Sequence, residues 1–247
     1  MSDLGEVKLF VVPLSHPCMT VRAGLDIKGI EFEEETVQAT GHRGHGDAVE
    51  QRFGPGHRKV PVLTIGDDDI HGSVTILRRL DELMPENALY PEPIAEAVRE
   101  AEQWGDEVIQ ESARRLPFAA LYFRPWAMGS FSGGDDLDPA GTDFAMAYTR
   151  GAWKALDMTA VSVNELLASL PDEIERIERY ADEGLIDGDS PTAADLQIAP
   201  STRLLLTIGD LRPLLEGTAA ERIAMRFFPD YPGDVPAGAL PEGWLPT

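Results

Sequence analysis

Pro61 constrains the fold of this chain more than any other residue. It stands at the entry to an apolar, β-branched segment, in the run Lys59-Val60-Pro61-Val62-Leu63-Thr64-Ile65. Proline donates no hydrogen bond to a sheet, so it is confined to strand starts, edges and bulges. One purposeful use of proline here is a cis Val60–Pro61 bond, which turns the N–H and C=O of Val60 outward into a cleft. We therefore predict a strand that starts at Pro61 and carries such a bond.

Two further segments are expected to join Pro61 in one site. Ser15-His16-Pro17-Cys18 lies where a buried strand gives way to a helix, and Gly72-Ser73 opens an amphipathic helix. A serine before the first helical residue is a typical N-cap, and the free N–H groups of a helix start favour anions. A buried cysteine often packs as a small apolar residue, so Cys18 has a structural interpretation as well.

The order of hydrophobic patterns predicts an α/β domain over residues 5–90, an all-helical domain over 94–228 and a proline-rich extended tail over 229–247. Gly129–Gly141 is expected to be a flexible connection or lid. The predicted strands are 7–12, 31–37, 62–65 and 70–71, and the hairpin connection between the last two is Gly66–Asp69. The predicted helices are 17–28, with Gly29 as its C-cap, 47–53, 73–84, 94–116, 143–169, 172–183, 191–206 and 219–228.

Composition limits the partners of the protein. A net charge of −22 opposes binding to DNA or RNA, and no apolar run is long enough to cross a membrane. The N-terminus is acidic and lacks an apolar signal core, so we expect a cytoplasmic protein. Its single cysteine excludes an internal disulfide. The loop 41–59 contains Arg43, Arg52, Arg58 and Lys59 against two acids, which favours a small anion.

Four short motifs, in this order and spacing, resemble the cytosolic glutathione transferase superfamily: Ser15-His16-Pro17-Cys18, Val60-Pro61, Ser73 at its helix start, and Thr192-Ala193-Ala194-Asp195. The resemblance covers nearly the whole chain. It implies a thioredoxin-like N-terminal domain followed by an all-α domain. It also implies that Thr192 to Asp195 is a capping arrangement that supports folding.

The resemblance implies a role for each residue of the site. Ser15 would hydrogen-bond the thiolate of glutathione or a similar low-molecular-weight thiol and activate it toward an electrophile. Lys59 would meet the terminal carboxylate of that thiol, Val60 before Pro61 would pair with its backbone, and Ser73 would hold its γ-glutamyl carboxylate. The family usually has Glu or Gln before this serine, to bind the amino group of the ligand, but this chain has Gly72.

Two other functions stay open. Cys18 matches the second cysteine of a glutaredoxin Cys-x-x-Cys motif, so a disulfide or dehydroascorbate reductase is one alternative. A non-catalytic binding or scaffold module is the other, because Gly72 lacks a polar side chain and because folds host unrelated functions. His42, His45, His57 and His71 lack helix-spaced metal ligands, so we expect no metal.

The resemblance also implies a homodimer, in which the N-terminal half of one subunit packs on the helical half of the other. Residues 1–90 carry 9 basic and 15 acidic side chains, net −6, and residues 91–247 carry 12 and 28, net −16. A crossed arrangement keeps the most acidic halves apart. The interface is expected to depend on apolar burial, since a dimer of this charge repels itself.

Overall fold

A computed structural model describes residues 4–38 and 44–245 of the chain. These residues form two compact units. The first comprises the chain up to Gln103 together with Ser190–Gln197, and the second comprises Trp104–Asp189 and the residues from Ile198 onward. The expected combination of a small mixed sheet and a mostly helical remainder is confirmed. The predicted domain boundaries remain predictions.

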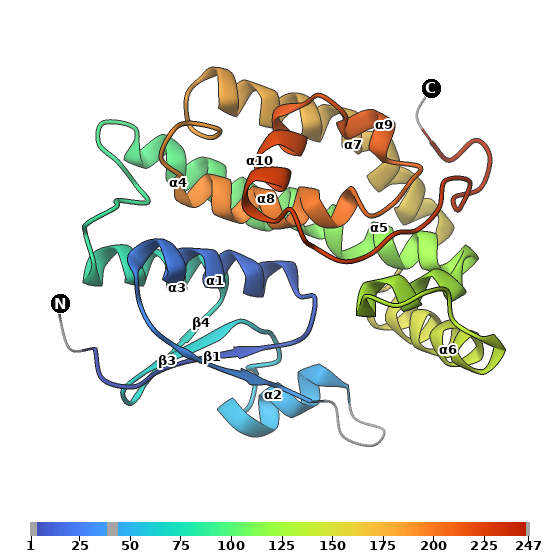
Figure 1. Ribbon diagram of the computed structural model, residues 1–247, viewed down its shortest axis with the longest axis horizontal. Helices are drawn as coiled ribbons and strands as arrows, with labels where there is room; N and C mark the ends of the chain where they lie inside the picture. The colour runs from blue at the N-terminus through green and yellow to red at the C-terminus, as the bar shows by residue number, and fades with distance from the viewer. Residues whose placement is uncertain (1–3, 39–43, 246–247) are drawn as a thin grey trace. The chain divides into compact units, whose positions relative to one another are not determined.

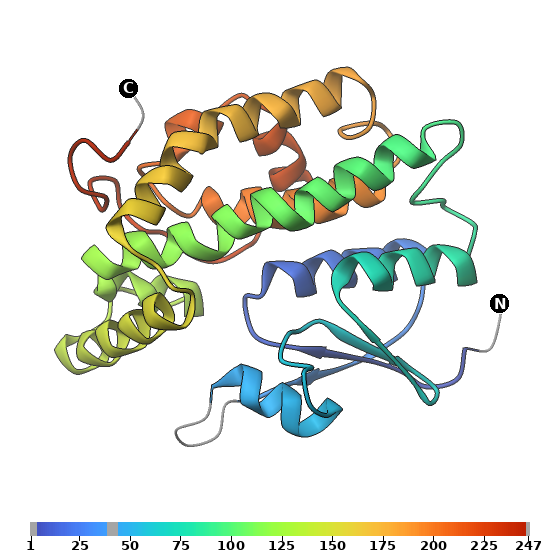
Figure 2. The same cartoon turned by 180° about the vertical axis from the view of Figure 1, so that it is seen from behind.

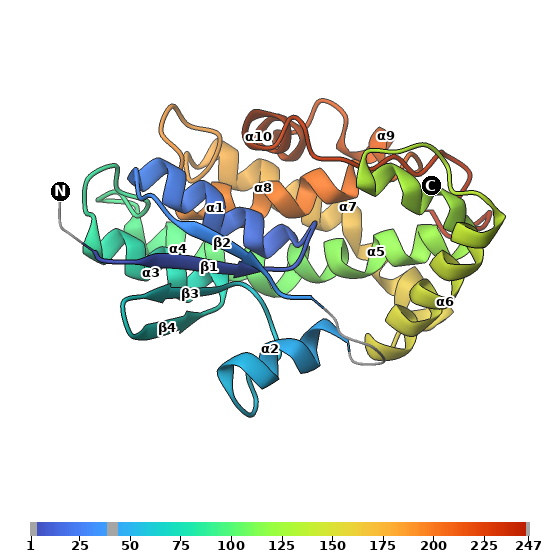
Figure 3. The same ribbon diagram turned by 60° about the horizontal axis from the view of Figure 1, so that its bottom comes forward.

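The first unit is built on a sheet of strand order β2-β1-β3-β4, which is visible in Figure 3. β1 pairs in parallel with β2 and antiparallel with β3, and β3 pairs antiparallel with β4. The strands are β1 (Val7–Val11), β2 (Glu33–Thr36), β3 (Val62–Ile65) and β4 (Asp68–His71). All four residues of β2 are exposed, as its acidic sequence predicts. The connection between β3 and β4 is predicted to comprise Gly66–Asp69. In the structure it is shorter, because β3 ends at Ile65 and β4 already begins at Asp68.

Two helices, α1 (His16–Lys28) and α3 (Ser73–Leu83), cover one face of this sheet, and α2 (His45–Phe53) covers the other (Figures 1 and 2). α1 ends as predicted at Gly29, whose φ of 64° is left-handed and suits glycine. Gly24 allows α1 and α3 to approach closely, since a Cβ there would collide with the Cδ2 atom of Leu77. On the other face, Val62 and Phe10 form a small core with Val49 of α2.

Lys28 fastens the far ends of α1 and α3. Its side chain is fully buried, and its Nζ donates to Asp81 Oδ1 at 2.6 Å and to the carbonyl of Met84 at 2.7 Å. The carbonyls of Glu86 and Asn87 also accept from Nζ, each at 3.0 Å. Both helices therefore have one fixed end, and their other ends begin at the predicted site residues.

Helices make up most of the remaining chain. They are α4 (Ala95–Trp104), the π-helical turn η1 (Gly105–Ile109), α5 (Gln110–Phe123), the 3-10 helix η2 (Pro125–Ser132), α6 (Pro139–Ala155), α7 (Ala160–Asp182), α8 (Ala193–Leu205), α9 (Arg212–Leu215) and α10 (Ala219–Phe227). The predicted helix 94–116 thus continues to Phe123. Thr192 and Asp195 form the predicted capping arrangement at the start of α8, where Thr192 N–H donates to Asp195 Oδ2 at 2.8 Å and Asp195 N–H donates to Thr192 Oγ1 at 3.3 Å.

Two helix boundaries and one connection in the second unit differ from the sequence prediction. The expected single helix 143–169 is broken before Ala160, where Thr159 and Ser162 form a capping box. Pro171 does not end a helix, because it lies inside α7. The expected lid at Gly129–Gly141 begins in a 3-10 helix, and the carbonyl of Asp135 lies so close to Gly129 that no Cβ would fit there.

The C-terminal segment runs extended over the second unit. Its Val235 forms a parallel bridge with Ile208, and Val235 N–H donates to the carbonyl of Thr207 at 2.7 Å. The carboxylate of Asp210 accepts from the backbone N–H of Leu240 at 2.8 Å, which holds the segment further along. Within the described residues, none of the helices combines the length and the apolar composition that a membrane crossing requires.

Candidate functional site

Ser15 occupies the N-cap of α1 but does not cap the helix with its side chain. The chain leaves β1 at Val11 and turns, so that Ser15 N–H donates to the carbonyl of Val12 at 3.1 Å. The Ser15 carbonyl accepts the first helical N–H groups, from Cys18 at 3.0 Å and Met19 at 3.2 Å. The hydroxyl group of a half-buried Ser15 is thus not used to hold the helix start.

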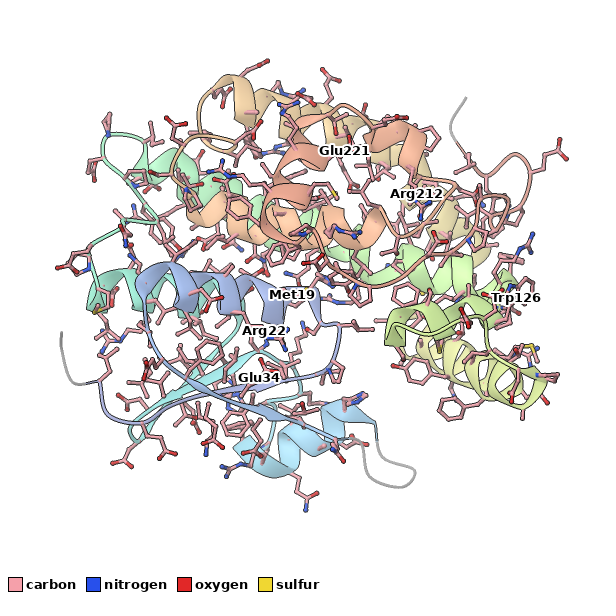
Figure 4. The ribbon with its side chains drawn as sticks, viewed as in Figure 1. Met19, Arg22, Glu34, Trp126, Arg212 and Glu221 are labelled. Atoms are coloured by element: carbon pink, nitrogen blue, oxygen red, sulfur yellow. The ribbon has the colours of Figure 1, made fainter. Side chains whose placement is uncertain are left out.

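Cys18 lies one turn into α1 and is completely buried. Burial raises the pKa of the Cys18 thiol, and this effect exceeds the lowering caused by the neighbouring Ser15 side chain and Val12 backbone. The positive charge of Arg22, one turn further along α1, also lowers this pKa slightly. Arg22 is itself held by Glu34 of β2, with Nε 2.5 Å and Nη2 2.7 Å from the carboxylate oxygens (Figure 4).

The Val60–Pro61 peptide bond is cis, as predicted. Pro61 is buried, whereas Val60 is half-buried and packs beside the small core of Phe10, Val49 and Val62. The carbonyl of Pro61 accepts the N–H of Gly72 at 3.1 Å, which ties the entry of β3 to the end of β4. The two predicted site segments, Val60-Pro61 and Gly72-Ser73, are therefore neighbours in the fold.

Gly72 and Ser73 begin α3. Gly72 has a φ of 84° and a ψ of 142°, a conformation that side chains rarely adopt, and a Cβ built there would meet nothing within 4 Å. Ser73 is only 3% exposed. The first helical hydrogen bond runs from Ile76 N–H to the Gly72 carbonyl at 3.0 Å, so the preceding N–H groups of α3 have no acceptor within the helix.

The basic loop before Pro61 is partly neutralised. Arg58 donates to Asp47 and to Glu50, each at 2.5 Å, and the pKa of Glu50 is lowered by the N–H of Gly56 and by Arg58. The guanidinium of Arg52 lies over the ring of Phe10, 5.3 Å from its centroid. Lys59 is exposed. Arg43, which contributes to the predicted positive charge, lies outside the described residues.

Sequence reasoning did not foresee that His57 and His71 stack, with ring centroids 4.1 Å apart and an interplanar angle of 23°. His71 also meets the edge of Phe53 at 5.7 Å. Burial first, and then the neighbouring His57, lower the pKa of His71. The only signal in the sequence is that one histidine precedes Lys59 and the other precedes Gly72. Among residues 4–38 and 44–245, no group of three or more metal-ligating side chains is suitably placed for a metal, and His42 falls outside these ranges.

A shallow pocket in the first unit lies away from these residues. It is lined by Asp26, Gly29, Ile30, Glu31 and Phe32, at the end of α1 opposite Ser15. The polar groups described above, and not this pocket, mark the candidate site, because they combine two helix starts with hydroxyl groups that do not cap those helices.

Comparison with known proteins shows which family this chain resembles. Residues 9–88 match the family model for the glutathione S-transferase N-terminal domain. A glutathione S-transferase from Rhodospirillum rubrum F11 superposes with a TM-score of 0.54 at 19% identity, over 90% of this chain and 86% of that one. The resemblance to the glutathione transferase-like superfamily is confirmed. No curated protein matches the chain in sequence.

Two further solved structures share the glutathione transferase fold. One, from Methylobacterium radiotolerans, is a glutathione S-transferase in complex with glutathione sulfonate, and it superposes with a TM-score of 0.51 at 20% identity over 94% of this chain and 95% of that one. The other is maleyl pyruvate isomerase, a bacterial zeta-class glutathione S-transferase, with a TM-score of 0.53 at 19% identity over 88% and 89%. All the predicted site residues, from Ser15 to Ser73, lie within the matched range 9–88.

Proposed function

We propose that this protein is a glutathione transferase-like enzyme that activates the thiol of glutathione, or of a similar low-molecular-weight thiol, for conjugation to an electrophile. The observation that carries the proposal is the hydroxyl of Ser15. It stands at the start of α1, belongs to a half-buried side chain and does not cap the helix, so the helix start does not use it. A hydroxyl group at this position can donate a hydrogen bond to the thiolate of a bound ligand and stabilise its charge.

The energies involved are sufficient for this role. A thiol of pKa about 8.5 must be stabilised as thiolate by roughly 2 pK units, or about 2.7 kcal/mol, to be mostly ionised at neutral pH. A hydrogen bond to a charged group supplies about 1.5–3 kcal/mol. The N-terminus of α1 adds about 0.3–1 kcal/mol, and up to ~2 kcal/mol where it is partly buried. Ser15 and the helix start together can therefore perform the activation.

The remaining residues of the site would bind the thiol. Exposed Lys59 offers an ammonium group to a carboxylate, and half-buried Val60 offers backbone groups beside Pro61. Ser73 offers its hydroxyl and the free N–H groups of the first turn of α3 to a second carboxylate. Gly72 lies between these segments without a side chain, so it does not contribute a polar group of its own.

The test is the variant Ser15→Ala. Conjugation to an electrophilic dye should slow by about 10- to 100-fold, which is the loss of one hydrogen bond to a thiolate, while thiol binding measured by calorimetry stays nearly unchanged. Its matched control is Thr218→Ala, which removes a side chain that does cap a helix, through the N–H of Glu221. That variant should lose about 1 kcal/mol of stability and keep its rate. An unchanged rate in Ser15→Ala would remove Ser15 from the mechanism.

Cys18 is a poor candidate for the working group of a reductase. Its complete burial and raised pKa both disfavour the thiolate that such chemistry requires. We expect alkylation of native Cys18 to be very slow at every pH up to 8 and rapid in denaturant. Rapid alkylation of the native protein below about pH 7 would restore the reductase as the better hypothesis.

The scaffold function is supported by Gly72. Its backbone conformation disfavours most side chains, so this position does not supply a polar side chain to the amino group of a bound thiol. Calorimetry with glutathione and with other cellular thiols distinguishes the two functions. Millimolar or tighter binding that Ser73→Ala abolishes supports the enzyme, whereas no binding of any thiol supports the scaffold.

The assembly and location of the protein are part of the same proposal. Homology of fold supports a crossed homodimer in the cytoplasm, and the net charge of −22 per chain requires that its interface be held by apolar burial. Light scattering at physiological salt should give the mass of a dimer that loosens only slightly at low ionic strength. A monomer at micromolar concentration would contradict this part and leave the proposed chemistry intact.

A further inference from the structure

The outer face of α6 exposes two aromatic rings. Phe144 is 70% exposed, more than any other large hydrophobic side chain in the described part of the chain, and Tyr148 is 44% exposed. Their rings stack, with centroids 6.4 Å apart and an interplanar angle of 20°. The ring of Tyr148 also meets Phe118 of α5 at 6.1 Å, so the aromatic surface continues onto the neighbouring helix. Exposed rings that are grouped in this way mark an interaction surface.

The exposed rings belong to a stripe that runs along α6. Four exposed residues recur at intervals of four, three and four positions, which places them on one side of a helix. They are Phe144, Tyr148, Gly151 and Ala155. The last two are small, so a second helix can lie close to this part of α6 while the two rings pack against its side. The 17 residues of α6 span about 25 Å, the length of a short partner helix.

Two basic side chains follow one flank of the stripe. Arg150 and Lys154 lie one turn apart and are exposed, and neither forms an ion pair or a hydrogen bond with a residue that the structure describes. The nearest acids along the chain are Asp143, about two turns before Arg150 on the same flank, and Asp157, beyond the end of the helix. α6 thus carries two basic side chains and one acidic one, in a chain with a net charge of −22.

We propose that this face of α6 binds a short amphipathic helix of a partner protein, whose apolar stripe is flanked by acidic residues. The aromatic rings would cover the apolar stripe, and Arg150 and Lys154 would pair with the acids. A symmetric contact with α6 of a second copy would instead bring these two cations against the same pair.

The charge of the whole chain limits the size of the partner. A net charge of −22 opposes large polyanions such as nucleic acid or an anionic bilayer. A few acids in direct contact with Arg150 and Lys154 are favourable nevertheless, because charges beyond about 8 Å are screened at physiological salt. The inference does not depend on the proposed function.

The experiment measures binding of three designed helical peptides, each as long as α6, to the full-length protein by fluorescence anisotropy at physiological salt. The first has a leucine stripe flanked by glutamates, the second has lysine in place of every glutamate, and the third has the composition of the first in an order that breaks the stripe. We expect the glutamate peptide to bind with a dissociation constant on the order of 100 µM, as suits a small interface. It should bind about tenfold more tightly than either of the others.

The sign of the charge preference is the sharpest readout. A protein of net charge −22 attracts a lysine-rich peptide without any specific site. A preference for the glutamate peptide therefore requires local cations. The double reversal Arg150→Glu and Lys154→Glu should abolish that preference. Its matched control is the double reversal Arg79→Glu and Arg99→Glu, which changes the net charge equally on exposed arginines of the first unit and should leave the preference unchanged.

The apolar part of the surface has its own variant. Phe144→Ser should weaken binding of the glutamate peptide about tenfold, because it removes the most exposed ring of the stripe. It should keep the unfolding midpoint of the parent protein, since this side chain is mostly in contact with water. The matched control is Val161→Ser on α7, which removes a side chain that is 67% exposed and should bind like the parent protein.

Several results would overturn the inference. Equal or tighter binding of the lysine peptide would exclude the charge complementarity, and no binding of the glutamate peptide at about 1 mM would exclude the site. Binding that the α6 variants leave unchanged would place the peptide elsewhere. If Phe144→Ser converted a dimer into a monomer in sedimentation, the face would join two copies of the chain. Binding to phosphatidylglycerol vesicles without binding of the glutamate peptide would identify a lipid surface instead.

Discussion

Lys28 is a buried cation whose removal should have a large effect on stability. Its side chain is fully buried, that of its partner Asp81 is 19% exposed, and the two atoms of the pair lie 2.6 Å apart. Removing one member of a buried ion pair typically costs about 3–5 kcal/mol, because the other charge is left without its partner. Asp81 keeps a hydrogen bond from Leu89 N–H at 2.8 Å and some contact with water. We therefore expect Lys28→Met to lose about 3 kcal/mol, at the lower end of that range.

Methionine keeps the length and apolar volume of the lysine stem, so that the variant tests the ammonium group alone. The carbonyls that Nζ leaves belong to the turn 84–87, most of which is exposed, and water can replace the lost hydrogen bonds there. Urea unfolding followed by circular dichroism near neutral pH should show a lower midpoint and an unchanged slope, since the surface exposed on unfolding stays the same.

The matched control for Lys28 is Arg79→Met on α3. Arg79 pairs with Glu82 at 3.1 Å, but both side chains are well exposed, and such a pair contributes about 0–1 kcal/mol. Adding Asp81→Asn to Lys28→Met should recover part of the stability, because the unpaired charge is then removed. The reasoning would be refuted if Lys28→Met cost no more than Arg79→Met.

Three more predictions concern buried groups away from the candidate site. Gly24→Ala should destabilise the protein by about 1–3 kcal/mol in urea unfolding, since the new Cβ collides with Leu77, and a gain in stability from the better helix former would contradict this. Tyr90→Phe should cost about 1.5–3 kcal/mol in the same assay, because the Tyr90 hydroxyl donates to the fully buried Glu102 at 2.6 Å. A neutral effect would mean that the carboxylate does not need this hydroxyl, since Arg78 also donates to it. Burial raises the pKa of Glu173 above the ordinary glutamate value. The contribution of this side chain to the free energy of unfolding is therefore greatest below the ordinary glutamate pKa, where the carboxyl group is protonated, and it is lost as the pH rises through the raised pKa. Glu173→Gln should therefore gain stability relative to the parent protein between acidic and neutral pH, and thermal unfolding that shows a pH-independent difference would exclude this titration.

The sequence predicts best those features that depend on one residue and its neighbours along the chain. The cis bond at Pro61, the left-handed Gly29 and the capping arrangement at Thr192 all follow from backbone chemistry that a few adjacent residues determine. The start of α3 at Ser73 is correct for the same reason. These features locate the candidate site and account for the success of the fold prediction.

Features that depend on contacts between distant residues could not be predicted in this way. Nothing near Lys28 in the sequence indicates that it meets Asp81 and the turn after α3. The stack of His57 on His71 likewise requires the sheet to bring two loops together. Pro171 predicts a helix boundary by local rules, but the packing of the buried residues of α7 on both sides of it, such as Leu167 and Ile174, outweighs the loss of one hydrogen bond.

In α1 and α3, the residues proposed to act on the thiol and the residue expected to stabilise the fold lie at opposite helix ends. Both helices begin at the candidate site, at Ser15 and Ser73, and are fastened at their other ends by Lys28. A change at Lys28 acts on the folded fraction, because its partners lie a full helix length from either serine. A change at Ser15 acts on the rate, because its hydroxyl contributes no capping hydrogen bond to the helix. Lys28→Met should therefore keep its rate per folded molecule, whereas Ser15→Ala should keep its unfolding midpoint. If Ser15→Ala instead unfolded earlier and kept its rate, the residue would be a structural cap, and thiol activation would have to be assigned to the start of α1 itself.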